Sequence, residues 1–359
     1  MRLCCKPLSF RLHQPVSSVL KISVCLLMAL PFFSCEKADE YDSSPVANFQ
    51  TLWQILDERY CFFDYKAEVY NLDWYEVRRR YSKLVSEDMS QAGLFDVMAR
   101  MLGELRDGHV NLISSFNVSH YNAFYLDYPH NFNSDLLQKT LGDYYRYVNG
   151  LYATILPDNI GYIYCGSFEN SIGETALDEI LQYVSFCHAL IVDVRDNGGG
   201  SLDSSERLAS RFTNSDLLTG YVCHKTGTGH SDFSDPEPVY LSAAVNHIRW
   251  QKPVAVLTNR RTFSAANDFV RCMRCTPQCV VVGDKSGGGS GLPMSQEMPN
   301  GWSVRFSACP TFDVDMEQTE FGIEPDVYAT LTDADIFRGE DTILEKAREI
   351  LNTPKEHKK

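Results

Sequence analysis

A serine, a histidine and two glycine-rich segments are the parts of this protein that could support nucleophilic catalysis. Ser264 follows an apolar run at residues 254–257 and a polar turn, and residues 265–270 have a helical pattern. The first backbone N–H groups of a helix lack intrahelical partners and favour negative charge. A serine placed there could act as a nucleophile beside an oxyanion hole. The alternative is that Ser264 or Thr262 only caps the helix, because serine and threonine are preferred caps.

His109 and the two glycine runs are the next candidates. His109 follows the segment Arg106-Asp107-Gly108 at the end of a helical pattern. A histidine can act as a general base near neutral pH, although an isolated histidine is commonly structural. Glycines 198–200 follow a predicted buried strand at residues 189–194 after three polar residues, and glycines 287–289 follow another apolar run at residues 280–283. Neither run has the spacing of a phosphate-binding loop, so a nest of N–H groups facing an oxyanion is the better interpretation.

Three segments, taken together, resemble the C-terminal-processing (tail-specific) serine peptidase family. They are residues 193–200, the turn at residues 263–266, and residues 283–289, in the family's order and spacing. The resemblance covers roughly residues 49–330. It implies an α/β (α+β) protein with a crotonase/ClpP-like catalytic domain, here without an inserted PDZ domain. It further implies hydrolysis of unstructured peptides or polypeptide C-termini through an acyl-enzyme, with no metal or cofactor.

The same resemblance distinguishes two catalytic arrangements. The tail-specific branch uses a Ser–Lys dyad, and its lysine position is occupied here by Gly289. The branch that is similar to the tricorn protease core uses a histidine from a preceding helical lobe and a glutamate after the last hairpin. By this resemblance Ser264 is the nucleophile, His109 the general base and Glu320 the acid that orients the imidazole, with Glu317 as second choice. The implied oxyanion donors are the N–H groups of Ala265 and of Gly198 or Gly199.

Two departures from the tricorn-like pattern keep other functions open. Gly108 stands where relatives have a serine beside the histidine, and the acid is offset in register. Because function depends on the geometry of a site and not on the fold, a catalytically impaired ligand- or peptide-binding protein on the same scaffold is the alternative. A related hydrolase such as an esterase is a third possibility.

The first 34 residues have the pattern of a secretory signal peptide. Four basic residues and no acidic ones accompany an apolar run at residues 22–33, which is too short to span a bilayer. Cys35 follows directly, so we expect a lipoprotein with the lipid on Cys35; a plain signal peptide is the alternative. The expected location is the cell envelope of a Gram-negative bacterium, in the periplasm or at the outer-membrane surface. Residues 35–47 form an acidic linker.

Charge and cysteine content limit the partners. The net charge is −14, with 47 acidic and 33 basic residues, which argues against nucleic acid and anionic lipid as partners. A membrane is therefore expected only through the lipid anchor. The spacing of Cys272, Cys275 and Cys279 resembles part of a zinc site, but no second pair follows, so we predict no metal. Eight cysteines follow Cys35; in an exported protein they permit disulfides without requiring them.

The hydrophobic pattern divides the sequence into a helical part and a βα part. Apolar residues at helical spacing predict helices near residues 49–60, 74–86 and 90–105. From residue 160 onward, short apolar runs alternate with helical patterns, as in a parallel sheet. The predicted divisions are a helical N-terminal lobe at residues 48–116, a connecting segment at 117–156, the crotonase-like peptidase domain at 157–335, and a C-terminal helix and tail at 336–359.

Overall fold

The structure is a computed structural model, and it describes residues 42–353. The signal peptide, Cys35 and most of the acidic linker lie outside these residues. Within residues 42–353, every helix is too short or too polar to span a bilayer. All eight cysteines of this range are present as free thiols.

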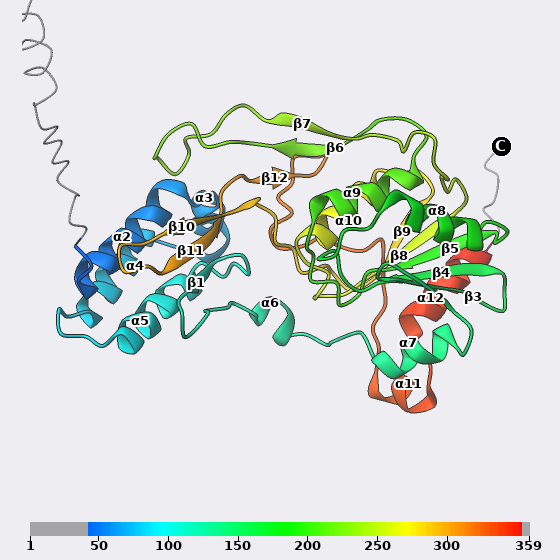
Figure 1. The fold of residues 1–359 in the computed structure, drawn as a ribbon, viewed down its shortest axis with the longest axis horizontal. Coiled ribbons are helices and arrows are strands. Elements are labelled where there is room, and N and C mark those ends of the chain that lie inside the picture. The colour runs from blue at the N-terminus through cyan, green and yellow to red at the C-terminus, as the bar shows by residue number, and fades with distance from the viewer. Residues whose placement is uncertain (1–41, 354–359) are drawn as a thin grey trace, which may run out of the picture. The chain divides into compact units, whose positions relative to one another are not determined.

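A seven-stranded sheet forms the centre of the larger part of the fold (Figure 1). Its strand order is β13-β9-β8-β5-β4-β3-β2, with parallel pairing from β13 to β4 and antiparallel pairing from β4 to β2. The strands are β2 (Arg146–Val148), β3 (Leu151–Ile155), β4 (Ile160–Cys165), β5 (Ala189–Asp193), β8 (Val254–Thr258), β9 (Cys279–Gly283) and β13 (Val327–Tyr328). Because β5 and β8 are almost entirely apolar, both of their faces can be buried, as in other parallel sheets.

Helices cover both faces of this sheet. One face packs against α8 (Glu174–Tyr183), α9 (Leu202–Ala209) and α10 (Ala265–Arg274). The other face packs against α7 (Ser134–Leu141) and α12 (Thr342–Asn352). Successive residues of β5 alternate between the two cores, with Leu190 and Val192 in one and Ile191 in the other. The result is a three-layer α/β arrangement, in agreement with the predicted fold class.

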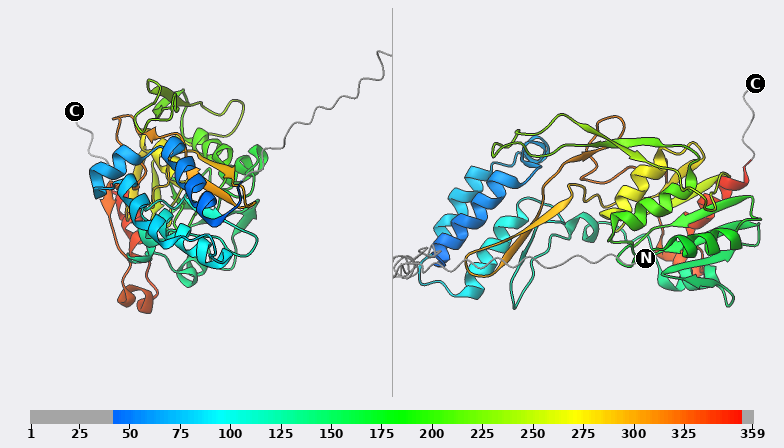
Figure 2. Two further views of the ribbon diagram at one scale, coloured as in Figure 1. Left: turned by 90° about the vertical axis from the view of Figure 1, so that its left-hand side faces the viewer. Right: turned by 45° about the horizontal axis from the view of Figure 1, so that its top comes forward.

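The N-terminal lobe combines four helices with a small antiparallel sheet (Figure 2). Its helices are α2 (Pro45–Arg59), α3 (Phe63–Tyr70), α4 (Trp74–Tyr81) and α5 (Gln91–Gly103). Ser44 caps α2 by accepting the N–H of Ala47, and Ser90 caps α5 by accepting that of Gly93. The sheet has the order β1-β11-β10, formed by β1 (Asn111–Ile113), β10 (Pro293–Glu297) and β11 (Ser303–Ser307). Thus the β10–β11 hairpin, which comes late in the sequence, completes the core of the early helices α2 to α5.

The predicted boundaries place the hairpin of β10 and β11 in the peptidase domain, but in the structure this hairpin packs against the N-terminal lobe. The two strands pair as an antiparallel hairpin, but Trp302, Val304 and Phe306 belong to the core of the N-terminal lobe. Their place in the sequence assigns them to the peptidase domain, because sequence order does not show which sheet a hairpin joins. The remaining short elements are α6 (Ala123–Leu126), β6 (Leu217–Val222), β7 (Glu237–Leu241), β12 (Thr311–Phe312) and α11 (Asp333–Arg338).

Candidate active site

Ser264 lies at the junction of the turn after β8 and α10, in a conformation that non-glycine residues rarely adopt. Its φ is 57° and its ψ is −123°. Its backbone N–H donates to the carbonyl of Gly288 at 2.8 Å, which fixes the turn against the second glycine run. The hydroxyl accepts no N–H of α10, so the interpretation of Ser264 as a helix cap is wrong. Backbone strain of this kind persists only where the surroundings hold it, and it is frequent at functional sites.

The Ser264 hydroxyl faces the buried imidazole of His109. The Oγ–Nε2 distance is 2.9 Å, and His109 is only 2% exposed. The other ring nitrogen, Nδ1, lies 3.2 Å from the carbonyl oxygen of Ser290. Because a carbonyl can only accept, Nδ1 must carry the proton, which leaves the lone pair of Nε2 for the serine hydroxyl. The structure therefore brings together the predicted nucleophile and base in the correct tautomer.

The charge on His109 is controlled mainly by burial. Burial lowers the pKa of His109 below 6.5, the Asp107 carboxylate opposes this shift, and the nearby Arg305 cation adds to it. Asp107 is itself buried, and Oδ1 accepts the backbone N–H of His109 at 2.7 Å. Oδ2 accepts the hydroxyls of Tyr60 at 3.0 Å and Ser307 at 2.9 Å. The imidazole is thus neutral at pH 7, as a general base must be.

Glu320 does not contact His109, contrary to its predicted role of orienting the imidazole directly. Its Oε2 accepts the backbone N–H of Ser290 at 3.2 Å, and the carbonyl of the same residue holds His109. Its Oε1 binds the ammonium of Lys66 at 3.0 Å. Glu320 therefore reaches the imidazole only through the backbone of Ser290. The second choice, Glu317, is exposed, and its side chain makes no hydrogen bond or ion pair with these residues.

Lys66 is the residue of this network that the sequence patterns did not reveal. It lies on α3, is fully buried, and also donates to the carbonyl of Arg106 at 3.1 Å. Burial raises the pKa of Glu320 to about 8, with a further contribution from Asp107, while Lys66 opposes the shift. The available signal was its spacing: Lys66 falls three residues after Phe63 and four after Phe62, on the buried face of α3.

The structure leaves fewer candidate oxyanion donors than the sequence analysis predicted. The N–H of Gly199 donates to the side chain of Asn197 at 2.9 Å, so it is already used. The N–H groups of Gly198 and Ala265 have no hydrogen-bond partner within residues 42–353. A Cβ on Gly199 would lie 2.8 Å from the Cβ of Ser264, so the glycine backbone directly abuts the serine. Gly198 and Ala265 remain the candidate pair.

The side chain of Phe263 accounts for the presence of glycine at positions 108 and 289, where this sequence departs from the two catalytic patterns of the relatives. Its ring stacks on Phe124 with centroids 4.7 Å apart and lies 4.9 Å from the His109 ring. A Cβ at Gly289 would lie 2.3 Å from this ring, and one at Gly108 would lie 2.8 Å from it. The Phe263 ring thus occupies the space that a lysine at position 289 or a serine at position 108 would need.

We expect Gly289→Ala to lose more stability than Gly301→Ala. Both glycines have similar positive φ values, 76° and 78°, but a Cβ at Gly301 meets no atom within 4 Å. The conformational cost should therefore match, at about 1 kcal/mol. Gly289→Ala should lose a further 1–3 kcal/mol, roughly, because of overpacking against Phe263. Urea unfolding of both variants measures the difference; equal losses would contradict the assignment.

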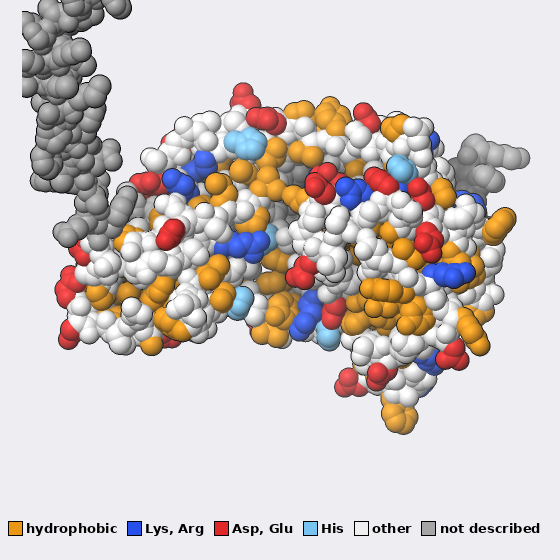
Figure 3. Space-filling view, in the orientation of Figure 1, with side chains coloured by type: hydrophobic (Ala, Val, Ile, Leu, Met, Phe, Trp, Pro, Cys, Tyr) orange, Lys and Arg blue, Asp and Glu red, His pale blue; other side chains and the backbone are white. Residues whose placement is uncertain are grey.

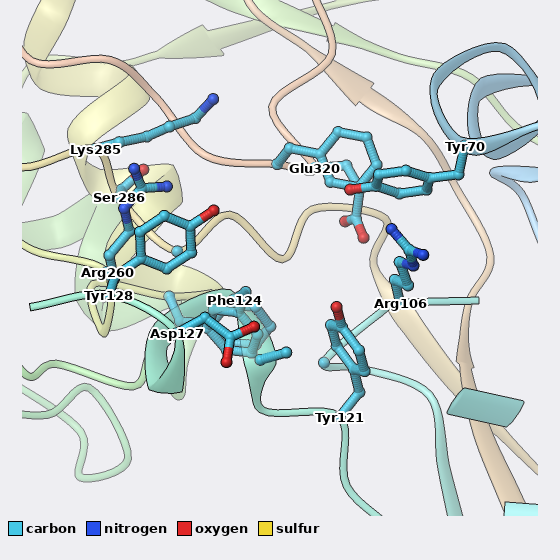
Figure 4. A pocket seen from close by; sticks show the side chains of 15 residues that line it. Tyr70, Arg106, Tyr121, Phe124, Asp127, Tyr128, Arg260, Lys285, Ser286 and Glu320 are labelled. Carbon is cyan, nitrogen blue, oxygen red and sulfur yellow. The ribbon is translucent and has the colours of Figure 1, made fainter. Parts of the chain in front are cut away.

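Two cavities lie at the candidate site. One of about 290 Å³ is lined by Ser264, His109 and Ala265, among others. The second, of about 430 Å³, is lined by Phe263, Gly108 and Glu320, among others (Figure 4). In Figure 4, Tyr70, Arg106 and Tyr121 enter this second cavity opposite Arg260 and Lys285. Figure 3 shows hydrophobic, basic and acidic side chains and a histidine around the hollow in the middle of that view.

Comparison with known sequences gives matches over two parts of the protein. A sequence model described as peptidase family S41 matches residues 159–329, and one described as the tricorn protease C1 domain matches residues 44–103. Carboxyl-terminal-processing peptidase 2 of Arabidopsis thaliana chloroplasts is 24% identical over 174 residues, which are 46% of this chain and 31% of the relative. The chain spans about a third of the length of the curated relatives it matches.

Two solved structures extend the similarity to most of the protein. A Parabacteroides merdae protein described as a candidate peptidase is 51% identical with a TM-score of 0.82, covering 87% of this chain and 98% of that one. The tricorn protease is 14% identical with a TM-score of 0.52, covering 86% of this chain and 36% of that one. At that low identity the tricorn similarity concerns the fold alone.

Proposed function

Because the chain belongs to peptidase family S41, whose members are serine peptidases, we propose that it hydrolyses peptide bonds through an acyl-enzyme on Ser264. The family assignment confirms the resemblance inferred from the sequence, including its tricorn-like part. The observation that carries the proposal is the 2.9 Å contact between Ser264 Oγ and the lone-pair nitrogen of His109. The strained backbone of Ser264 supports it, because capping does not explain that conformation.

The proposed reaction proceeds in two halves. His109 Nε2 takes the proton of Ser264 as Oγ bonds to the substrate carbonyl carbon, and the new oxyanion is held by the N–H groups of Ala265 and Gly198. The C–N bond then breaks as His109 gives its proton to the leaving amine. A water molecule, deprotonated by the same imidazole, attacks the acyl carbon, and the bond from that carbon to Oγ breaks as His109 returns the proton to Ser264, which releases the second product as a carboxylic acid. Throughout, the Ser290 carbonyl holds the proton on Nδ1.

Glu320 and Lys66 act in this proposal as positioning residues. Glu320 accepts the N–H of Ser290, and Lys66 pairs with the Glu320 carboxyl. Both residues therefore fix the backbone at Ser290, whose carbonyl accepts the Nδ1 proton of His109. This indirect connection keeps the tautomer fixed, which is the contribution expected of the third member of a catalytic triad.

The proposed substrates are unstructured peptides or unfolded polypeptide segments. The support is the cavity of about 290 Å³ at Ser264, which has room for a few side chains of an extended peptide and not for a folded domain. The test is incubation of the protein and of its Ser264→Ala variant with unfolded casein, with new peptide ends identified by mass spectrometry. Cleavage by the first protein alone supports the proposal. If neither folded protein cleaves casein, the binding-protein function replaces it.

We expect the acid limb of kcat/KM to lie below pH 6.5. Burial lowers the pKa of His109 below that value, so the base stays neutral, and active, at a pH where a free histidine would be half protonated. As the pH falls through the lowered pKa, the imidazole takes up a proton and activity is lost. A pH profile of peptide cleavage measures this limb. A limb above pH 6.5 would contradict the assignment of His109 as the controlling base.

We also propose that the protein is exported and lipid-anchored through Cys35. The support is the sequence alone: the basic start, the apolar run and the cysteine directly after it. Metabolic labelling with a radioactive fatty acid should label the protein but not its Cys35→Ser variant. Labelling of neither would favour a plain signal peptide, and equal labelling of both would show that the lipid is not on Cys35.

A further inference from the structure

Arg305 is a cation within the catalytic cavity that the proposed chemistry does not use. It lies on β11, opposite Asn111 of β1 and Ser295 of β10. Its neighbours Val304 and Phe306 face the lobe core, so Arg305 points from the opposite face of the strand. Together with Ser264 and His109 it lines the cavity of about 290 Å³.

The Arg305 guanidinium makes no hydrogen bond and no ion pair with any side chain or carbonyl in residues 42–353. Arg271, which lines the same cavity, is by contrast bound to Asp268 at 2.6 Å and to the carbonyl of Thr219. Burial lowers the pKa of Arg305, and the charge of Asp107 only partly offsets this. A partly desolvated guanidinium without a hydrogen-bond partner costs free energy. A carboxylate ligand would offset this cost, because its two oxygens can accept two parallel N–H bonds from the guanidinium.

The position of Arg305 relative to His109 indicates which part of a substrate it would meet. His109 must give a proton to the leaving amine, so the substrate residues that follow the scissile bond pass on the imidazole side. Arg305 pairs across the sheet with Asn111, two residues after His109, and both Arg305 and His109 line the cavity. The cavity's carboxylates, Glu206 and Asp268, come from α9 and α10, and neither forms an ion pair with Arg305.

We propose that Arg305 binds a carboxylate of the substrate on the leaving-group side of the scissile bond, and so determines specificity. That carboxylate is either the free C-terminus of a short leaving peptide or an acidic side chain close to the bond. The chemistry recognised is the same in both cases. The proposal rests on Ser264 as the nucleophile for its consequence in cleavage, but the binding step can be measured without turnover.

The test measures binding in the full-length protein with Ser264→Ala, which cannot form the acyl-enzyme. Three mixtures of N-acetylated hexapeptides of otherwise uncharged residues serve as probes. They have a free C-terminal carboxylate, a C-terminal amide, or an amide plus one internal glutamate. Retention is measured by equilibrium dialysis and mass spectrometry, with Arg305 intact, with Arg305→Gln and with Arg305→Lys. Arg249→Gln is the matched control, because Arg249 is exposed and does not line this cavity.

With Arg305 intact, we expect at least one carboxylate mixture to bind about 10- to 100-fold better than the plain amide mixture. The preference should disappear in Arg305→Gln, survive in part in Arg305→Lys and stay unchanged in Arg249→Gln. The mixture that is preferred identifies the source of the carboxylate. Equal binding of all three mixtures, or a preference that persists in Arg305→Gln, would overturn the proposal. Failure of casein cleavage with this preference intact would refute the peptidase function and leave the carboxylate site standing.

Discussion

Removing either Ser264 or His109 should lower kcat/KM by about 10⁴-fold or more, and removing both should cost little beyond that. The reason is that the two groups act as a unit: the 2.9 Å contact transfers one proton, and either residue alone has nothing to exchange it with. Ser264→Ala, His109→Ala and the double variant, assayed on one peptide taken from the casein digest, give the comparison. Residual activity should come only from the oxyanion donors and substrate binding.

Folding must be separated from chemistry in that experiment. His109 is buried between Ser264 and Ser290, so its replacement by alanine leaves a cavity and lowers stability. His109→Gln is a second variant that keeps polar atoms in place, and it should be as inactive as His109→Ala while unfolding at a higher urea concentration. If the activity losses of the two single variants multiply in the double variant, Ser264 and His109 act independently. That result would contradict the view that the two residues form one catalytic unit.

The second large effect is expected at Lys66. Lys66→Met leaves the Glu320 carboxyl buried without its cation, and removal of one partner of a buried pair costs about 3–5 kcal/mol. The loss should depend on pH. Burial raises the pKa of Glu320 to about 8 even though Lys66 opposes the shift, so removing Lys66 should raise this pKa further. The variant can then bury the carboxyl in its neutral form at pH 6, but keeping the proton on the carboxyl costs more free energy as the pH rises to 9. We therefore expect a larger loss of stability at pH 9 than at pH 6, measured by urea unfolding at both values.

Two further variants test the origin of that loss. Lys66→Met combined with Glu320→Gln removes the unpaired charge and should recover part of the stability at pH 9. Lys285→Met is the matched control, because Lys285 pairs with the largely exposed Glu324 and such a pair contributes about 1 kcal/mol or less. An equal loss of stability in Lys66→Met and Lys285→Met would show that the buried Lys66–Glu320 pair contributes no more to stability than the exposed pair.

The sheet and the two residues of the proposed nucleophile–base pair, Ser264 and His109, could be located from the sequence because both leave a local signal. Strand β5 is a nearly continuous apolar run, and Ser264 follows a strand, a turn and then a helix within a short stretch. His109 was identified by its motif, and the structure places it at Ser264 although 155 positions separate them. Local patterns and a family resemblance were sufficient for these features.

The positioning network could not be predicted, because it depends on a backbone link and on a distant pair. Glu320 reaches His109 through the peptide of Ser290, and no side-chain pattern reports how a peptide group is oriented. Lys66 and Glu320 are 254 positions apart, and nothing in the spacing of either indicates the other. The family resemblance implied Gly198 or Gly199 as a donor, but the Asn197 side chain accepts the N–H of Gly199. Such competition depends on side-chain positions, which composition does not specify.

The hairpin of β10 and β11 has a consequence for how this protein can be divided into fragments. The stretch that matches the peptidase family, residues 159–329, includes this hairpin, but Trp302, Val304 and Phe306 bury their side chains against residues that precede it. Expressed alone, that stretch would expose an aromatic surface and lack His109. A gene fragment chosen from sequence similarity would therefore encode neither an independently stable unit nor a complete catalytic one. The smallest portion that can be transferred between proteins is one that keeps both the early helices and the late strands.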